Sequence, residues 1–508
     1  MSVILPAGTV QQKPKIKYIS VNRQQLCFAE LDLERLIEDG HAARAIWEMV
    51  ERNDVSKFEE EAESWEGDGG RPRWPPRVLI SVLVYGYSMG VASAREMERL
   101  QRHEPGLRWL CADQTINHHT ISDFRVRHEK ALEDLFAQIL GVLCGEGLVN
   151  LDTVMVDGTK VEAAAGKASY RRGKTLEQHV EQAREKLKQL RAQSETEREQ
   201  QDKKRRVAQE RAARERVERI ERSLEKLKEL EQKATQREQE KLRVSETEAE
   251  ARKMKFENGG WDLAYNVQVS TETSHKIVVG VEVSTAANDL GQLEGAVQGV
   301  QVNCGTLPKQ VVADNGYASR KNVERMEELE VTFIAPWKED ESREAGACKT
   351  NGIDREFSGS KFGMHADGDG LQCKAGKKLV RIGEKVHNGQ SRVIYEAAVA
   401  DCAQCQWREG CCGHRGAARR VERVKESEAM KKYLARMEEP ATQELYKRRK
   451  EVAEFPHLWS KAVLGLRRFT VRGLTKAKME AIWIAISHNI SRWMCARTAM
   501  KRTVAVGA

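Results

Sequence analysis

The feature that most constrains the fold is an abrupt change of composition in the middle of the chain. Residues 175–256 consist largely of Glu, Lys, Arg and Gln, with apolar residues recurring at steps of four and three in two seams. The seams are Leu176, Val180, Ala183, Leu187 and Leu190, and then Ala213, Val217, Ile220, Leu224 and Leu227. This spacing predicts two amphipathic helices separated by the polar residues 193–206, that is, a helical hairpin or paired coiled coil. A solvated, partly disordered linker is the alternative that this composition also allows.

The rest of the composition sets broad limits. A chain of 508 residues exceeds one ordinary core, so we expect several structural units. Lys and Arg number 85 against 77 Asp and Glu, a net charge of +8, which permits a nucleic-acid partner without demonstrating one. No stretch approaches the ~20 apolar residues of a membrane span. We therefore expect a cytoplasmic protein without a membrane partner.

The N-terminal part shows helical periodicity. After a tail at residues 1–27, apolar residues recur at three and four spacing through residues 28–150, and one strongly apolar helix is expected to begin near Val78. Further on, Thr120 or Ser122 is a candidate N-cap of a helix that carries Arg125 and Arg127 early in its length. This is the outline of a helix-turn-helix, in which both arginines contact DNA. A plain helical bundle with surface arginines fits these residues equally well.

Strand signals flank the charged segment. A short β-branched run at residues 153–156 ends at Asp157, and a later run at 309–313 ends at Asp314. Between and after them we expect strands at 263–270, 276–284 and 331–335 and helices at 291–302 and 321–330. This order predicts a mixed α/β sheet. One aspartate at a strand end is commonly a turn former, but two in matching positions can face one cleft and share a cation.

Several short strings occur in an order typical of a known family. They are VDGTK at 156–160, VADNGY at 312–317, GLRRF at 465–469 and RGL at 472–474, with Tyr446, Glu454 and Lys461 before the last two. Together with PPRVL at 75–79, YGY at 85–87 and SARE at 93–96, they resemble the DDE transposases of bacterial insertion sequences, in the branch with the Tyr-Arg-Glu-Lys signature. The resemblance spans residues 25–495.

The resemblance implies a ribonuclease-H-like core in which Asp157, Asp314 and Glu454 bind two divalent cations, Mg²⁺ or Mn²⁺. Two such cations about 3.5–4 Å apart activate the attacking oxygen and neutralise the leaving oxygen of a phosphodiester, and they prefer carboxylate ligands. The signature fits imperfectly, because counting from Tyr446 through Arg449 places its Glu on Ala453. Glu454 keeps the required spacing to Lys461, and Glu451 is the fallback.

Other polar residues have roles that either the site or the local fold can explain. Asp289, with Asn288, is the N-cap of the helix at 291–302 or a residue beside the metal site, and we favour the cap. Basic and aromatic residues near Glu454 are expected to contact DNA phosphates. They are Tyr446, Arg449, Lys461, Arg467, Arg468 and Arg472.

Six of the eleven cysteines lie between residues 348 and 412. The set Cys373, Cys402, Cys405 and Cys411 supplies four soft ligands for a structural zinc ion, and free thiols are the alternative. Catalysis by this cluster is not expected.

These patterns predict six segments. They are the tail at 1–27, a helical DNA-binding domain at 28–150, a catalytic core at 151–174 and 257–337, the helical insertion at 175–256, a Cys-rich insertion at 338–423, and C-terminal helices at 424–508 that complete the core. The predicted activity is cleavage of element ends and their joining to target DNA, by a homodimer or larger homo-oligomer on double-stranded DNA in the bacterial cytoplasm. A catalytically inactive DNA-binding relative and a metal-dependent nuclease without strand transfer are the alternatives.

Overall fold

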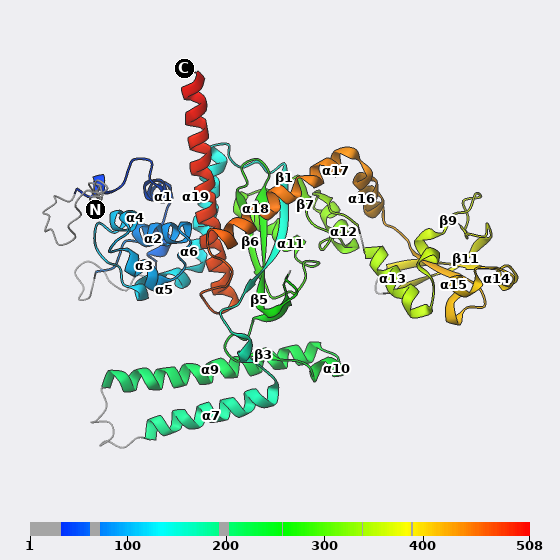
Figure 1. Cartoon of the computed structure of the whole chain (residues 1–508), viewed down its shortest axis with the longest axis horizontal. Helices are drawn as coiled ribbons and strands as arrows, with labels where there is room; N and C mark the ends of the chain where they lie inside the picture. The colour runs from blue at the N-terminus through cyan, green and yellow to red at the C-terminus, as the bar shows by residue number, and fades with distance from the viewer. Residues whose placement is uncertain are drawn as a thin grey trace, which may run out of the picture.

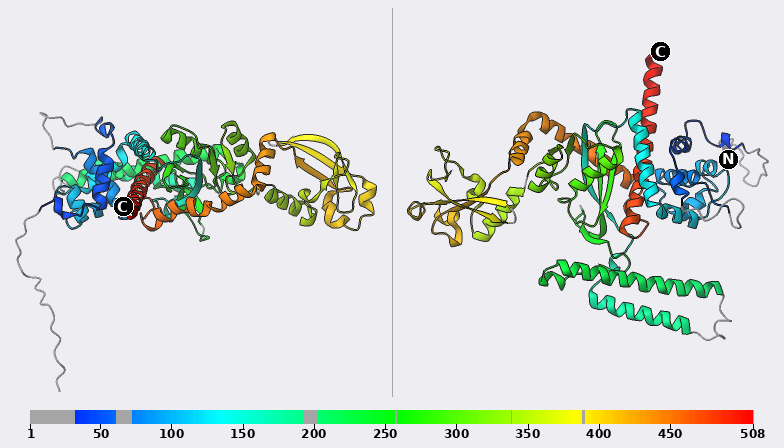
Figure 2. Two further views of the ribbon diagram at one scale, coloured as in Figure 1. Left: turned by 90° about the horizontal axis from the view of Figure 1, so that it is seen from above. Right: turned by 180° about the vertical axis from the view of Figure 1, so that it is seen from behind.

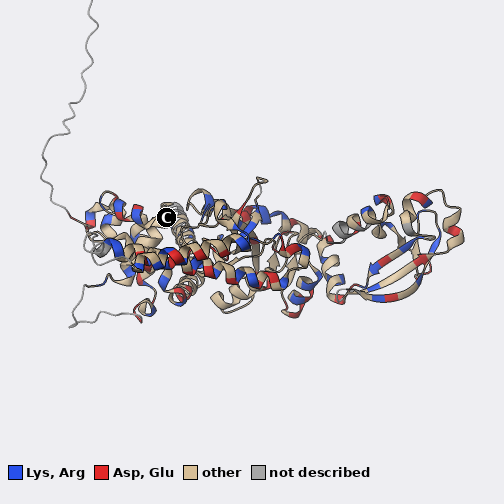
Figure 3. Ribbon diagram, turned by 90° about the horizontal axis from the view of Figure 1, so that it is seen from below, with Lys and Arg blue, Asp and Glu red and all other residues tan. Residues whose placement is uncertain are grey.

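The computed structural model describes residues 32–60, 72–192, 203–256, 258–337, 339–387 and 390–507. The molecule is elongated, with helices at the N-terminal end, a central sheet, a pair of long helices set apart from the sheet, and a second small sheet at the far end (Figures 1 and 2). Basic and acidic residues are interleaved, without a large field of one sign in the view of Figure 3. Within the described ranges, no helix is long and apolar enough to cross a membrane.

The N-terminal part is helical, as the periodicity predicts. Its helices are α1 (Ala42–Glu51), α2 (Pro76–Ser88), α3 (Ala94–Leu100), α4 (Pro105–Leu110), α5 (His118–Arg127) and α6 (Glu129–Gly145). Helix α2 begins at Pro76, slightly before Val78, because a proline in the first turn sacrifices no helical hydrogen bond. The predicted cap of α5 is wrong: Asn117, not Thr120 or Ser122, accepts the hydrogen bond from His119 N. The predicted tail lies outside the described residues.

The central sheet is mixed. Its strands are β1 (Thr153–Glu162), β4 (Arg252–Lys255), β5 (Trp261–Glu272), β6 (Val278–Ser284), β7 (Gln310–Val312) and β8 (Thr332–Ile334). Strand β5 lies antiparallel between β1 on one side and β6 and β4 on the other, while β7 and β8 continue the sheet in parallel beyond β1. Helix α11 (Leu293–Cys304) connects β6 to β7, and helix α12 (Arg320–Glu328) connects β7 to β8.

Helices from the C-terminal part cover the sheet. They are α16 (Glu428–Glu438), α17 (Pro440–Lys447), α18 (Arg449–Ala462) and α19 (Leu474–Gly507). Met155 and Val312 pack with Val452 and Ala453 of α18, while the neighbouring strand residues face the main core, as strand alternation requires. These contacts fix α18 directly over the junction of β1 and β7.

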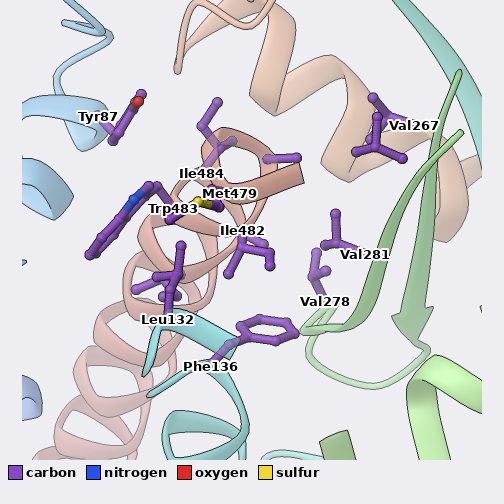
Figure 4. Close-up of a cluster of buried hydrophobic side chains, with 14 of the residues drawn as sticks. Tyr87, Leu132, Phe136, Val267, Val278, Val281, Met479, Ile482, Trp483 and Ile484 are labelled. Carbon is purple, nitrogen blue, oxygen red and sulfur yellow. The ribbon is translucent and has the colours of Figure 1, made fainter. Parts of the chain in front are cut away.

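Helix α19 joins the sheet to the N-terminal helices. Figure 4 shows its residues Ile482 and Trp483 among buried side chains that come from β6, such as Val278, and from α6 and α2, such as Leu132 and Tyr87. Burial of side chains of this size stabilises a fold by roughly 1.5–3 kcal/mol each. The N-terminal helices and the sheet therefore share one hydrophobic core.

The charged segment forms two long helices, α7 (Gly173–Ala192) and α9 (Lys203–Lys233), followed by the short α10 (Gln236–Gln239). The pairs Arg184–Glu221 and Arg191–Glu210 show that α7 and α9 run antiparallel, and apolar residues of both seams form one small core. At the base, β2 (Tyr170–Arg171) pairs with β3 (Val244–Ser245). The polar break lies largely outside the described residues.

The Cys-rich part has its own sheet, in the order β13-β12-β11-β10-β9. The strands are β9 (Gly363–Met364), β10 (Leu371–Gln372), β11 (Lys378–His387), β12 (Gln390–Ala397) and β13 (Arg420–Val424). The accompanying helices are α13 (Glu339–Asn351), α14 (Val399–Ala403) and α15 (Arg408–Cys412). In Figure 1 this part lies at the end of the molecule opposite the N-terminal helices.

Candidate active site

The candidate site lies along an open stretch of β1. Strand β1 pairs with β5 from Val154 to Glu162, but its parallel pairing with β7 ends at Met155. Asp157 is therefore in the middle of a ten-residue strand, and the expectation that the strand ends at Asp157 is wrong. The antiparallel hydrogen bonds to β5 extend β1 past the aspartate, while the departure of β7 leaves the other edge of β1 unpaired beside it.

Asp314 joins Asp157 at this point. Met155 is the register partner of Val312, and each aspartate stands two residues beyond its member of that pair. Asp314 Oδ1 accepts a hydrogen bond from Gly316 N at 2.7 Å, which orients the carboxylate just after β7. Burial, helped by the nearby charges of Asp314 and Asp289, raises the pKa of Asp157 to about 7, although the Arg449 cation opposes the shift.

Asp289 is the third acidic residue of this centre. Its Oδ1 accepts hydrogen bonds from Asn266 Nδ2 and Gln268 Nε2, both at 2.7 Å. The favoured interpretation of Asp289 as a helix cap is wrong, because the N-cap position of α11 is Gln292. A Cβ atom at Gly158 would lie only 2.4 Å from Asp289 Oδ1, so only glycine lets this carboxylate approach β1 so closely.

Asn266, Gln268 and Tyr317 belong to the same network and are absent from the residues predicted for the site. The Tyr317 hydroxyl donates to Gln268 Oε1, and all three side chains are buried. A signal for two of them exists, because Asn266 and Gln268 are polar residues at alternate positions of an otherwise apolar strand. Such a pair lines one face of the sheet and needs buried partners.

Helix α18 covers the same stretch of β1. Arg449 Nη1 lies 3.3 Å from Asp157 Oδ1, and His457 Nε2 lies 3.8 Å from Asp157 Oδ2. Burial lowers the pKa of His457 to about 4, so its imidazole is neutral, and its Nε2 has no hydrogen-bond partner among the described residues. Arg449 therefore lies beside the acidic centre, and Tyr446 packs against the cluster of Met155 and Val312.

Glu454 is not brought into contact with the two aspartates. Its side chain is exposed on α18, although it lies between Arg449 and His457 along the helix and neighbours His457 at the i+3 position. Glu451 pairs with Lys276 at 2.8 Å and is also exposed. In the part of the chain that the structure describes, no group of three or more His, Cys, Asp or Glu side chains is arranged to hold a metal ion.

The basic residues that follow Glu454 border the open edge of β1. The Lys461 ammonium donates to Thr159 Oγ1, two residues beyond Asp157. Farther along, Glu162 N donates to Arg467 O at 3.1 Å, so the chain after α18 lies alongside β1. Arg467, Arg468 and Arg472 are exposed, and Arg468 pairs with Glu162 at 2.6 Å.

The two arginines of α5 differ in their surroundings. Arg127 is exposed, as expected of a residue that contacts DNA. Arg125 is 5% exposed, donates to Ala92 O at 2.7 Å and lies 3.9 Å from the buried Glu480. The expectation of a phosphate contact is corrected for Arg125, because its guanidinium is enclosed between the N-terminal helices and α19.

The cysteines of the small sheet lie near one another. Cys373, Cys402, Cys411 and Cys412 pack in one cluster. The sulfur atoms of Cys373 and Cys402 accept backbone N–H groups of Lys377 and Arg419 at 3.3 and 3.4 Å. Cys405, part of the predicted zinc set, is half-buried and lies outside this apolar cluster.

Two segments of the chain match models of known protein families. Residues 372–494 match the family model described as the transposase DDE domain, and residues 31–127 match the transposase domain DUF772. Both matched families are families of transposase domains. These two matches confirm the resemblance to the DDE transposases of insertion sequences. Glu454 falls inside the first matched segment, whereas Asp157 and Asp314 lie outside both.

More distant likenesses are weak. No curated protein matches the chain. Among solved structures, a cryo-EM structure of the piggyBac transposase synaptic complex with hairpin DNA is similar over 91% of this chain and 75% of that chain, at 9% sequence identity and a TM-score of 0.33. A likeness this distant does not establish a shared fold.

Proposed function

We propose that this protein cleaves phosphodiesters at the ends of a bacterial insertion sequence and joins the cut ends to target DNA. The observation that carries the proposal is the placement of Asp157 and Asp314 at matching positions on adjacent parallel strands, under a helix that carries Glu454. The strand order, with β1 between an antiparallel hairpin and two parallel strands, supports a ribonuclease-H-like core. We assign the reaction to this junction.

The donor chemistry fits Mg²⁺ or Mn²⁺. Asp157 and Asp314 offer carboxylate oxygens, the ligands that hard cations prefer, and Asp157 is largely buried beside other carboxylates whose charges a cation would neutralise. Asp157, Asp314 and Glu454 would hold two cations, which supply activation of the attacking oxygen and neutralisation of the leaving oxygen. Glu454 reaches the aspartates only after a side-chain or helix movement, which we assign to binding of the cations or of DNA.

The chain's own residues position the DNA strand. Lys461 borders the carboxylates on the open edge of β1, and Arg467, Arg468 and Arg472 continue the basic border beyond it. Such residues hold phosphates by charge and fix the register of the strand without reading its sequence. Arg127, exposed on α5, is assigned to the same DNA through the N-terminal helices. A homodimer is the simplest assembly that holds two ends together.

The Cys-rich part is assigned a structural zinc ion. Cys373, Cys402 and Cys411 share one cluster, and cysteine sulfur is a preferred ligand of structural zinc. Cys405 is the predicted fourth ligand, while Cys412 belongs to the cluster. This ion would stabilise the small sheet and take no part in catalysis.

The experiment that tests this function uses DNA carrying the ends of the element that encodes the chain, together with a target plasmid. We expect cleavage and joining with Mg²⁺ and neither with EDTA. Asp157→Ala and Asp314→Ala should abolish both reactions while binding to the ends is nearly unchanged, because each removes a cation ligand and no phosphate contact. Cutting without joining would favour the nuclease, and binding without cutting by the unaltered chain would favour the inactive relative.

A further inference from the structure

The two arms of the helical hairpin, α7 and α9, present two faces of different character. On one face, Arg184 and Arg191 of α7 pair with Glu221 and Glu210 of α9 at 2.6 and 3.1 Å. Glu181, three residues before Arg184 on α7, also pairs with it at 3.1 Å. This face therefore carries arginine and glutamate side chains in ion pairs that join the two arms.

The opposite face carries cations from both arms. Two residues along an α-helix turn a side chain by about 200°, so Lys186 and Arg219, each two residues from a member of the Arg184–Glu221 pair, lie on the other side of the hairpin. Because the arms run antiparallel and the two steps go in opposite chain directions, Lys186 and Arg219 stand at the same height. Arg216 lies one turn before Arg219 on α9. We call Lys186, Arg216 and Arg219 the basic face.

The charge of the basic face is not neutralised by carboxylates. Among the residues that the structure describes, none forms an ion pair with a cation of this face. Glu215, one turn from Arg219, is held by Arg211 at 2.8 Å, and Glu246, at the base of the hairpin, contacts His179 at 2.7 Å. Like charges gathered on one face repel each other, so an anion bound there relieves the repulsion.

The surroundings of the basic face select a polyanion and not a protein. Val207 is the only large apolar side chain exposed in the described part of α7 and α9, and it stands nine residues, or two and a half turns, before Arg216, on the opposite side of the helix. A protein partner would need an apolar or aromatic core at its interface, and the same face of a second copy would repel this one. Gln182, exposed one turn before Lys186, adds an amide that can donate to a phosphate oxygen.

We propose that the basic face binds the phosphate backbone of duplex DNA, at a distance from the bond that is cut. The hairpin is set apart from the central sheet in Figure 1, so this contact is a second hold on DNA outside the acidic centre. Ser223 Oγ donates to Ser245 O at 2.9 Å, which fixes α9 to the β2–β3 pair at the base. The inference rests on the proposed function and names the partner of the helical insertion.

The test measures the salt dependence with which the full chain binds two fluorescent duplexes, one carrying the element end and one of unrelated sequence. Loss of one phosphate contact reduces the slope of log affinity against log salt concentration by about 0.9. We expect this reduction in each of Lys186→Gln, Arg216→Gln and Arg219→Gln, on both duplexes alike, because phosphate contacts carry no sequence information. The matched control is Lys188→Gln, which removes the same charge from an exposed lysine on the opposite face of α7 and should keep the original slope.

Circular dichroism and melting temperatures equal to those of the unaltered protein show that each variant is folded. Original slopes for all three variants of the basic face would overturn the proposal, as would an equal reduction in Lys188→Gln, which would show an effect of net charge alone. Binding is measured without divalent cations, so cleavage plays no part in it. A chain that shows the expected slopes but does not cut DNA when Mg²⁺ is added would support the basic face and count against the proposed function alone.

Discussion

Asp157 and Asp314 lie side by side because each follows, by two residues, one member of the last paired position between β1 and β7, Met155 and Val312. Beyond this position β7 turns away while β1 continues along β5. The divergence leaves both aspartates at the carboxyl end of the parallel pair, where α/β sheets commonly bind ligands. Both the carboxylates and the basic residues of α18 face this stretch of β1.

Replacing Asp157 with Asn should stabilise the protein in the absence of divalent cations. The pKa of Asp157 is raised from an ordinary value near 3.8 to about 7, so folding favours the neutral carboxyl. Its contribution to stability is full below about pH 4 and is lost as the pH rises through 7, a loss of up to about 4 kcal/mol. Asp157→Asn should therefore exceed the unaltered protein in free energy of unfolding above pH 7, and match it near pH 4.

Urea unfolding between pH 4 and pH 8 measures this difference. Adding Mn²⁺ should raise the stability of the unaltered protein and not that of Asp157→Asn, which separates cation binding from the effect of burial. A difference that stays constant across the pH range would show that Asp157 is ionised in the folded protein at all of these pH values.

Glu454 and Glu451 should differ sharply in their importance for cleavage and for cation binding. Glu454 neighbours His457, which contacts Asp157, whereas Glu451 is held by Lys276. We expect Glu454→Gln to reduce cleavage by at least a hundredfold and to weaken Mn²⁺ binding in calorimetry. Glu451→Gln, with the same loss of charge on the same helix, should keep both cleavage and Mn²⁺ binding. The reverse result would identify Glu451 as the third carboxylate that binds the cations.

The sequence predicts the parts of this site that depend on neighbouring residues, and misses the parts that depend on residues far apart along the chain. The two aspartates are recognisable because β-branched runs precede both, a purely local signal. The end of β1 cannot be recognised from the sequence, because the length of β1 is set by its pairing with β5, more than a hundred residues later. The surroundings of Arg125 likewise depend on Glu480 in the last helix. The sequence favours a cap at Asp289 for the same reason, since its partners Asn266 and Gln268 come from a different strand.

Arg125 and Arg127 should separate stability from DNA binding. Arg125→Ala removes a buried cation near Glu480, which is 1% exposed, and should lower the free energy of unfolding by about 3–5 kcal/mol. Arg127→Ala should change stability by less than about 0.5 kcal/mol and weaken DNA binding. Denaturant unfolding and fluorescence anisotropy measure the two effects, and original stability in Arg125→Ala would restore it as a candidate DNA contact.

The cysteine cluster should bind about one zinc ion per chain, which elemental analysis of the purified protein can measure. Cys402→Ser should lose the ion and destabilise the small sheet, because Cys402 is buried at the centre of the cluster. Of Cys405→Ser and Cys412→Ser, the variant that loses the ion identifies the fourth ligand. Protein without zinc, in which all thiols react freely in the native state, would establish the free-thiol alternative.

The helical insertion should be removable without loss of the core. Arg171 pairs with Val244 at its base, so a short Gly/Ser loop can join residue 172 to residue 243 in place of α7, α9 and α10. The return of the chain to the core is fixed separately by Glu248, which accepts hydrogen bonds from Ala165 N, Tyr265 Oη and Gly473 N at 3.1, 2.8 and 3.0 Å. These hydrogen bonds remain after the deletion.

We expect the deletion variant to fold and to bind Mn²⁺ as the unaltered protein does, and to fail in bringing two element ends together. The arms of the hairpin pack on each other through a small apolar core, and their outer faces are exposed and charged. Such faces contribute little to the stability of the sheet and are available to a second subunit or to DNA. Native gels with two differently labelled element ends measure pairing, and melting temperature and calorimetry serve as controls. A variant that unfolds, or that no longer binds Mn²⁺, would place the hairpin within the catalytic core.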